Sequence, residues 1–247
     1  MRKVSLILSL LIAIIISSCK NNSKDDTNNT IEYSGPNVIN IVLKESLALN
    51  ATSQEQLQYH SDNERNVTIS NDGVIFGKNV GEANITVSNT ENKLTIPVIV
   101  NLFEEPTLNF GASTKEIRAI YGEPKRNFGD SVYVYGQEQG WYSYAVWEMN
   151  FFFNKDKYYE SHLYIRNDLD YLVSKFLDEN YFYYNELTDT LNNEVKTLHV
   201  YFDNKDPRFA DIVVGKQYNV GTKKDILLVY ASAESIVNSR CTNFVTE

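Results

Sequence analysis

The sequence has little of what disulfide-stabilised and metal-dependent proteins need. It contains only two cysteines, which exclude a disulfide framework, and three histidines, none with a second His or Cys at metal-ligand spacing. A G-x-S-x-G nucleophile motif, a P-loop, a dinucleotide-binding fingerprint and an EF-hand loop are also missing. We therefore nominate no catalytic residue, no metal site and no cofactor, and we expect a protein that is not an enzyme.

Basic residues are scarce as well. Lysine and arginine number 23 against 32 aspartates and glutamates, which gives a net charge of −9, and no basic stripe runs along the chain. Such a chain repels a phosphate backbone, so we expect no nucleic-acid partner. The hydrophobic content of 43% predicts that most of the 247 residues fold, which is enough for two domains of ordinary size.

The apolar run at the N-terminus is too short to cross a membrane. It covers residues 4–16, after Arg2 and Lys3, and a transmembrane helix needs about 20 apolar residues. This order of charge, short apolar core and small residues indicates a secretory signal over residues 1–18. Its end, Ile16-Ser17-Ser18-Cys19, resembles the lipobox of bacterial lipoproteins. The resemblance implies acylation of Cys19, with palmitate among the acyl chains, and a lipid anchor in the membrane; the alternative is an ordinary signal peptide with a chance cysteine.

Residues 19–37 are predicted to be a flexible tether. Most of residues 20–30 are Asn, Ser, Thr, Lys and Asp, which cannot bury apolar surface. Within them, Ser23-Lys24-Asp25-Asp26 resembles the short acidic signals that carry Bacteroidetes lipoproteins to the outside of the outer membrane. This resemblance implies a lipid anchor in the cell outer membrane that faces the cell surface. The alternative is a solvated linker that holds two aspartates.

Residues 38–102 are predicted to form a small all-β sandwich of two antiparallel sheets. Short segments alternate apolar and polar residues, and Asn71-Asp72-Gly73 supplies a tight hairpin turn. The segments 73–77 and 81–87 together resemble the end of the group 2 bacterial immunoglobulin-like domain. That family implies a spacer in a surface protein, or an adhesive domain. Residues 103–107 follow as a linker.

Residues 108–233 are predicted to form an α+β domain, followed by a tail over residues 234–247. Ser113 and Glu116 form a capping box for a first helix, which Gly122 ends. A second helix begins near Asp168 and has an apolar stripe: Leu169, Leu172, Val173, Phe176 and Leu177. Strands follow each helix, so we expect two helix-plus-antiparallel-strand units that share one sheet, with both helices on one face.

Two short segments of this domain resemble known envelope families. Residues 110–113 and 121–124 resemble a helix of the outer-membrane assembly lipoprotein BamE and of the β-lactamase inhibitory protein. The second of these is itself a tandem repeat of helix and sheet. The resemblance implies a fold class and no substrate.

The candidate binding site is the face of this sheet that points away from the helices. The alternation of side chains predicts Tyr144 and Glu148 outward on one strand, His162 and Tyr164 on the next, and His199 and Tyr201 on a later one, where Leu198, Val200 and Phe202 point inward. Trp141 and Tyr142, in the preceding loop, extend this surface. Tyrosine, histidine and carboxylate side chains together are typical of recognition surfaces. The alternative is a solvated sheet face with cross-strand aromatic pairs.

These patterns predict a membrane-anchored, non-enzymatic binding or adhesion module of the cell envelope, with a protein or a glycan as ligand. The alternative is a periplasm-facing accessory lipoprotein, of the assembly or inhibitor type.

Overall fold

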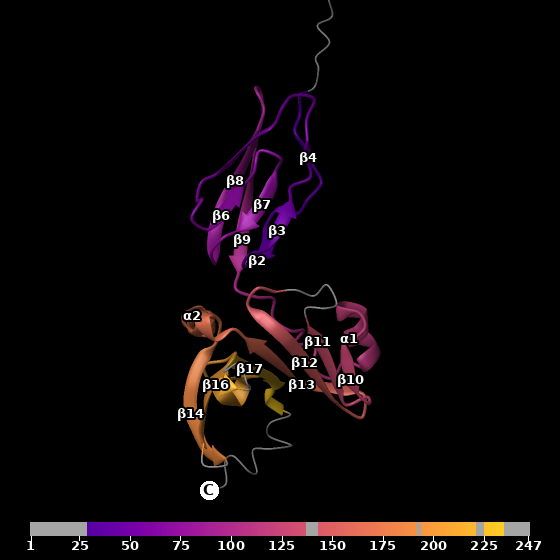
Figure 1. Ribbon diagram of the computed structural model, residues 1–247, viewed down its shortest axis with the longest axis vertical. Helices are drawn as coiled ribbons and strands as arrows, with labels where there is room; N and C mark the ends of the chain where they lie inside the picture. Colours follow the sequence, from indigo (N-terminus) through magenta and orange to yellow (C-terminus); the bar gives the residue numbers. More distant parts are fainter. Residues whose placement is uncertain (1–28, 137–142, 192–193, 221–224, 235–247) are drawn as a thin grey trace, which may run out of the picture.

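The computed structural model describes residues 29–136, 143–191, 194–220 and 225–234. The described chain forms two bodies stacked end to end along the long axis of the molecule (Figure 1). Cys19, Trp141, Tyr142 and nearly all of the tail predicted over residues 234–247 lie outside these ranges. Among the described residues, no helix is long and apolar enough to span a bilayer.

The first body is a sandwich of two β-sheets. Its sheets enclose one apolar core, in which Val67, Ile75, Ile85, Val87 and Val98 are fully buried. This confirms the predicted all-β sandwich. One sheet has the order β2 (Ile39–Val42), β9 (Lys93–Asn101), β8 (Gly81–Ser88), β5 (Gln58–Ser61), and the other β3 (Ser46–Ala48), β7 (Val74–Gly77), β6 (Val67–Ile69); the short strands β1 (Glu32–Tyr33) and β4 (Ala51–Thr52) pair beside them.

The pairing of the sandwich strands differs from the prediction at one place. β2 and β9 run parallel, whereas we expected antiparallel sheets throughout. The chain passes through the other sheet between these two strands, and such a crossover allows a parallel neighbour. The predicted hairpin between β6 and β7 is confirmed, because Gly73 has a φ of 73°, which a glycine adopts without a Cβ clash.

The second body is built on a single eight-stranded antiparallel sheet. Helix α1 (Thr114–Tyr121) precedes its first four strands, and a short 3₁₀ turn (Asn167–Leu169) and helix α2 (Asp170–Asn180) precede the last four. The two sets of four strands meet along β13 and β17. Across the sheet the strands are β10 (Arg126–Phe128), β11 (Val132–Gly136), β12 (Val146–Asn154), β13 (Lys157–Ile165), β17 (Asp225–Ser232), β16 (Ile212–Val220), β15 (Glu194–Phe202) and β14 (Phe182–Leu191).

Both helices begin as their sequences predict and pack on the same face of this sheet. Ser113 and Glu116 form the capping box of α1, and Gly122 ends the helix with a φ of 77°. Ile117 from α1, and Val173 and Leu177 from α2, are fully buried in the core of the second body. The apolar stripe on α2 thus determines which way the helix faces.

The end of the sandwich docks onto the second body. Leu43, Leu102 and Phe103 belong to the core cluster of the second body, and the Phe103 and Phe176 rings lie 4.9 Å apart. The hydroxyl of Tyr181 donates a hydrogen bond of 2.6 Å to Glu105. The residues predicted as a linker, 103–107, are therefore packed between the two bodies. This contact fixes their relative placement and encloses the grooves described below.

Candidate binding face

The strand register divides the eight-stranded sheet into two faces. Paired residues point the same way, so one row can be followed across neighbouring strands. One face carries the fully buried residues Tyr133, Phe151, Ser161, Val214 and Tyr230, against which the helices pack. We call this the helix face and its opposite the outer face. A central row of the outer face contains Val134, Asn150, His162, Val229, Gly215, Val200 and Asn185.

A group of polar and aromatic side chains lies on the outer face of β12 and β13. The Nε2 atom of His162 is 2.7 Å from Glu160, and its ring centroid is 4.4 Å from that of Phe152. Nearer the edge of the sheet, Arg126 forms an ion pair of 2.9 Å with Glu148. The group therefore combines an acid–base pair, an aromatic surface and a surface ion pair, with residues from β10, β12 and β13.

Burial changes the acidity of one tyrosine in this group. Burial raises the pKa of the Tyr164 hydroxyl, the nearby Glu148 carboxylate raises it further, and a hydrogen bond with Asn150 acts in the opposite direction. Tyr164 therefore keeps its proton at neutral pH and can donate a hydrogen bond to a ligand.

Two amide oxygens on the outer face are buried without a hydrogen-bond partner among the described residues. They are Oδ1 of Asn150 and Oδ1 of Asn185, on strands of different halves of the sheet but in the same row. Asn150 is 8% exposed. A buried acceptor without a donor destabilises a protein by about 1–3 kcal/mol. Both oxygens are enclosed by the protein, so their unpaired state lowers the stability of the fold and offers no accessible acceptor to a partner.

The structure brings three of the predicted site residues together. Glu148, His162 and Tyr164 lie on the outer face of the adjacent strands β12 and β13, where Glu148 pairs with Tyr164. Trp141 and Tyr142 lie outside the described residues.

The predicted placement of His199 and Tyr201 is wrong. His199 pairs with Lys216 and Tyr201 with Val214, which places both on the helix face, and Tyr201 is 6% exposed. Leu198, Val200 and Phe202 take the outer face instead. The prediction assumed that β15 buries only its aliphatic side, but Val200 and Tyr201 are both buried on opposite sides of the strand, and Tyr201 belongs to the core under the helices.

Tyr144 is also separated from the outer-face group. The register shifts between Val146 and Glu148, which marks a β-bulge at Trp147, and the strand begins only at Val146. Because a bulge changes the alternation of side chains, Tyr144 does not follow Glu148 onto the outer face. It lies instead in a groove between the two bodies.

Sequence reasoning missed three contributors to the outer face: Arg126, Phe152 and Asn185. Arg126 belongs to β10, a short and fully exposed edge strand that has no hydrophobic alternation to reveal it. Phe152 lies between two inward phenylalanines, so the alternation of β12 was the signal that could have found it.

Among the described residues, no group of three or more His, Cys, Asp and Glu side chains is arranged to hold a metal ion.

No protein-family model matches the sequence, and neither does any curated protein. Solved structures with some similarity include a bacterial Ig-like domain containing GH10 xylanase from termite gut, at 15% identity and a TM-score of 0.26 over 34% of this chain and 23% of that one. Domains 5–6 of the S-layer protein SbsC match at 13% identity and a TM-score of 0.27, over 82% and 90% of the two chains. Human protocadherin-24 EC1-2 matches at 10% identity and a TM-score of 0.26, over 82% of this chain and 95% of that one. The chain spans less than a quarter of the xylanase. Scores of this size carry no argument for a shared function.

Proposed function

We propose that the outer face of the eight-stranded sheet is a non-enzymatic binding surface for a protein partner. The observation that carries this proposal is the group of partly exposed polar and aromatic side chains around His162, with Glu160 at 2.7 Å and the Arg126–Glu148 ion pair nearby. A partner's polar groups would form hydrogen bonds with these side chains, and the exposed ring of Phe128 would add apolar contact, as at other protein interfaces.

The first body would then hold this surface away from a membrane. In this proposal Cys19 is acylated after cleavage of the signal peptide, and the residues between it and the sandwich tether the protein to the outer membrane, facing the cell surface. The predicted tether of residues 19–37 was too long, because Ile31 and Tyr33 pack against the sandwich core and β1 pairs with β4. The sandwich, as an immunoglobulin-like domain, serves as a spacer. Its docked junction with the second body supports this role, because Leu43, Leu102 and Phe103 are buried in the core of the second body.

A site-specific photo-crosslinker tests the binding surface without knowledge of the partner. p-Benzoylphenylalanine would replace Phe128, which is 62% exposed on the outer face, and in a control protein Tyr171, which is 78% exposed on α2. On intact cells we expect a discrete adduct from position 128 and none from position 171. Alanine at Glu148, His162 and Tyr164 should abolish that adduct. Equal adducts from both positions, or an adduct that survives the triple substitution, would contradict the proposal.

Metabolic labelling tests the anchor separately. Radiolabelled palmitate should enter the wild-type protein and not a Cys19→Ala variant. Equal incorporation into both would rule out acylation at this cysteine, while the crosslinking result would stand independently.

A second function is favoured by the architecture of the second body. Each helix is followed by four strands, and the two units meet along their last strands. This arrangement supports the tandem-repeat class that the β-lactamase inhibitory protein represents, and so a periplasm-facing inhibitor or assembly factor. Protease added to intact cells separates the two functions, because a surface protein is digested and a periplasmic one survives.

A further inference from the structure

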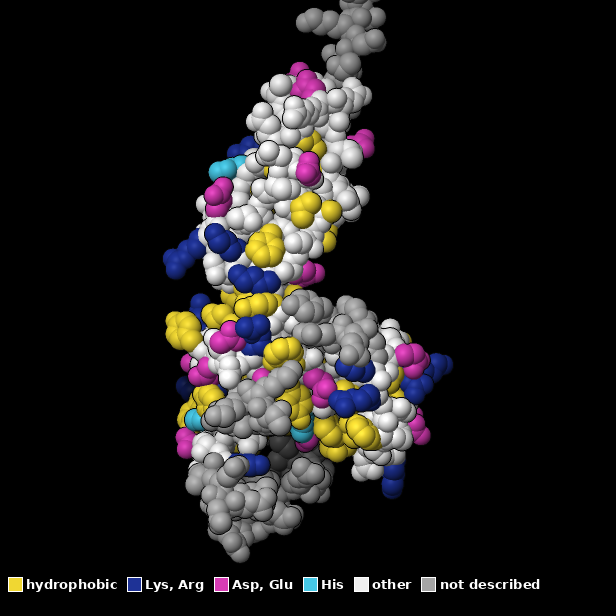
Figure 2. Space-filling view, viewed as in Figure 1, with side chains coloured by type: hydrophobic (Ala, Val, Ile, Leu, Met, Phe, Trp, Pro, Cys, Tyr) yellow, Lys and Arg dark blue, Asp and Glu magenta, His cyan; other side chains and the backbone are white. Residues whose placement is uncertain are grey.

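A groove between the two bodies carries a set of polar residues that the proposed binding face does not use. It has a volume of about 590 Å³, within the range of small-molecule sites. The sandwich contributes Lys44, Arg65 and three asparagines, Asn63, Asn66 and Asn79; the second body contributes Tyr144. Apolar residues of both bodies form the rest of its lining. Figure 2 shows Lys and Arg side chains gathered on the sandwich next to this junction.

The groove is lined by two cations and by no carboxylate. Within the described part of the chain, neither Lys44 nor Arg65 forms an ion pair; the Lys44 ammonium donates a hydrogen bond of 2.7 Å to the Lys78 carbonyl. The protein as a whole has a net charge of −9, so this concentration of positive charge is local. An anion entering the groove would gain two charge partners without displacing an internal one.

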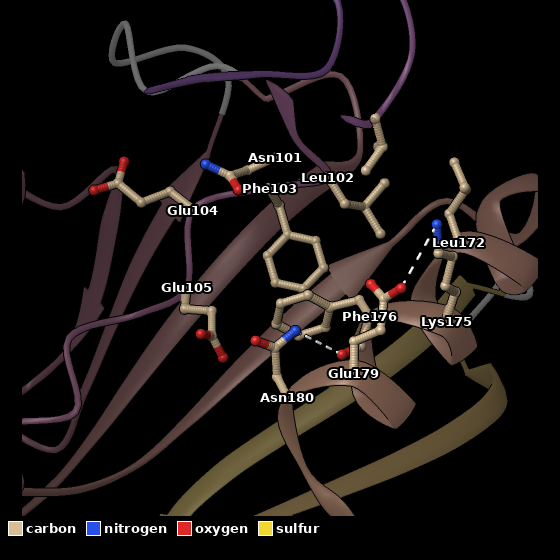
Figure 3. Close-up of a pocket in the computed structure, with 11 residues that line it drawn as sticks. Asn101, Leu102, Phe103, Glu104, Glu105, Leu172, Lys175, Phe176, Glu179 and Asn180 are labelled. Atoms are coloured by element: carbon tan, nitrogen blue, oxygen red, sulfur yellow. Dashed lines mark hydrogen bonds and ion pairs between the residues drawn. The ribbon is translucent and has the colours of Figure 1, made fainter. Parts of the chain in front are cut away.

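A second groove at the same junction provides a contrast. It shares Val80 and Leu172 with the first but is lined by Glu104, Glu105 and Glu179 (Figure 3). Its single cation, Lys175, is already 3.6 Å from Glu179. The two grooves are therefore opposite in charge, and only the first favours an anionic ligand.

Lys44 lies in a turn whose backbone suits glycine better than lysine. It has a φ of 66°, and the Glu45 N–H donates to the Val42 carbonyl. Lys155 and Asp156 have the same left-handed conformation in the hairpin between β12 and β13, so the turn by itself points to no ligand. Its value is experimental, because Lys44→Gly removes the ammonium without straining the backbone.

The uncharged residues suit a polyhydroxylated ligand. The Nδ2 groups of Asn63 and Asn66 both donate to the Glu82 carbonyl at 3.1 Å, and that of Asn79 donates to the Arg65 carbonyl. These bonds fix the amides, and no described residue donates to their Oδ1 atoms, which can accept hydrogen bonds from hydroxyl groups.

Tyr144 is held at the wall of the groove by a cation. The guanidinium of Arg166 lies 4.4 Å from the centroid of its ring, and two hydrogen bonds of 2.9 and 2.8 Å fix that guanidinium to Asp168. A ring held in this way is a flat apolar surface on which the C–H face of a sugar can stack.

We propose that this groove binds an acidic oligosaccharide. Its carboxylate or sulfate group would pair with Lys44 and Arg65, its hydroxyls would donate to the three asparagine oxygens, and one sugar ring would stack on Tyr144. The site is separate from the outer face, so each can be tested while the other is intact.

Calorimetric titration of the full chain with two acidic probes, tetragalacturonate and a heparin-derived tetrasaccharide, tests the site. We expect at least one of them to bind, with an affinity that falls as salt is added. The fully methyl-esterified tetragalacturonate has the same sugar without the charge and should bind about tenfold more weakly or not at all. If neither acidic probe binds, or if tetragalacturonate and its ester bind equally well, the proposal is wrong.

Two variants and a matched control assign the binding to this groove. Lys44→Gly and Arg65→Gln should each weaken binding about tenfold. Lys44→Gly is informative because glycine suits the left-handed turn, so the melting temperature should stay within a few degrees of the wild type. A loss of affinity in this variant would then result from the missing ammonium and not from unfolding. Lys93→Gln removes one charge from an exposed position at the other end of β9 and should leave binding unchanged. An equal loss in Lys93→Gln would show only non-specific attraction and would overturn the site.

Discussion

The two faces of the eight-stranded sheet use the same strands for different purposes. On the helix face, most buried polar groups bond within the protein: the Tyr158 hydroxyl donates to Ser161 at 2.9 Å, and the buried ammonium of Lys216 donates to Asp170 and Ser174 at 2.6 and 2.7 Å. The Tyr230 hydroxyl is the exception among the described residues of this face. On the outer face, the Asn150 and Asn185 oxygens accept nothing from the described residues. Buried polar groups that are bonded within the protein stabilise the fold, and the two unpaired acceptors of the outer face lower its stability.

The largest effect should come from truncating a phenylalanine on the helix face. Phe151 is fully buried among aromatic neighbours, so Phe151→Ala should lower the free energy of unfolding by about 3–5 kcal/mol. The matched control is Phe128→Ala on the outer face, where 62% exposure predicts a loss below about 1 kcal/mol. Urea denaturation of both variants measures this difference. Similar losses would mean that the two faces are not distinct in packing.

The buried ion pair on the helix face should respond asymmetrically to substitution. Lys216 is 1% exposed, whereas the Asp170 side chain is 46% exposed. Asp170→Ala leaves a buried ammonium with a hydrogen bond to Ser174 and the Tyr218 ring at 4.5 Å, and with no counter-charge in this pair. It should destabilise the protein by about 2–3 kcal/mol, at the low end for broken buried pairs because Asp170 is half-exposed.

Lys216→Met, in contrast, replaces the ammonium by an apolar side chain of similar volume and leaves Asp170 in contact with water. We expect this variant to stay within about 1 kcal/mol of the wild type in the same urea measurement. A larger loss of unfolding free energy in Lys216→Met than in Asp170→Ala would show that the unpaired aspartate, and not the unpaired lysine, is the destabilising group.

Alkaline pH should destabilise the protein through two buried tyrosines of the helix face. Burial raises the pKa of Tyr135 and of Tyr201 to about 12, above the value of 10.0 expected in the unfolded chain. The folded state therefore holds these protons more tightly. Their contribution to the free energy of unfolding is fully present below pH 10 and is lost as the pH rises from about 10 to 12. Thermal melts across this range should show the decline, and Tyr201→Phe should make it shallower. A decline of the same slope in that variant would exclude Tyr201 as a contributor.

The smallest change in the free energy of unfolding should come from a substitution on the outer face, and it should be the one that does not destabilise the protein. Asn150→Leu removes a buried acceptor without a partner, and it also removes the hydrogen bond with Tyr164. Because the first change stabilises the protein and the second costs about 1 kcal/mol, the free energy of unfolding should stay unchanged or rise by up to about 1 kcal/mol. The same variant should reduce the crosslinked adduct from position 128. A clear loss of stability would indicate that the amide is needed for folding, and that the contrast between the two faces fails at this residue.

The local features of the fold were predictable because short-range chemistry sets them. The Ser113–Glu116 capping box and the Asn71–Gly73 turn depend only on residues a few positions apart. The buried side of α2 likewise follows from the spacing of its apolar residues. Each of these predictions is confirmed.

The candidate site was predictable only in part, because face assignment fails where a strand is apolar on both sides or carries a bulge. Glu148, His162 and Tyr164 share the outer face as predicted. β15 presents Val200 to one face and Tyr201 to the other, and hydrophobicity alone does not choose between them. The bulge at Trp147 moved Tyr144 into the groove between the bodies.

The sequence by itself determined the elements that local hydrogen bonding and periodicity fix: the helices, most of the strands, the hairpin turn and the acidic balance of the chain. Only the tertiary structure decided which residues become neighbours across the sheet and across the junction. Pairing β13 with β17 joins two halves more than 60 residues apart, and docking Phe103 against α2 creates grooves of opposite charge. The physical reason is that these contacts depend on long-range register and on complementary surfaces, which no window of sequence contains.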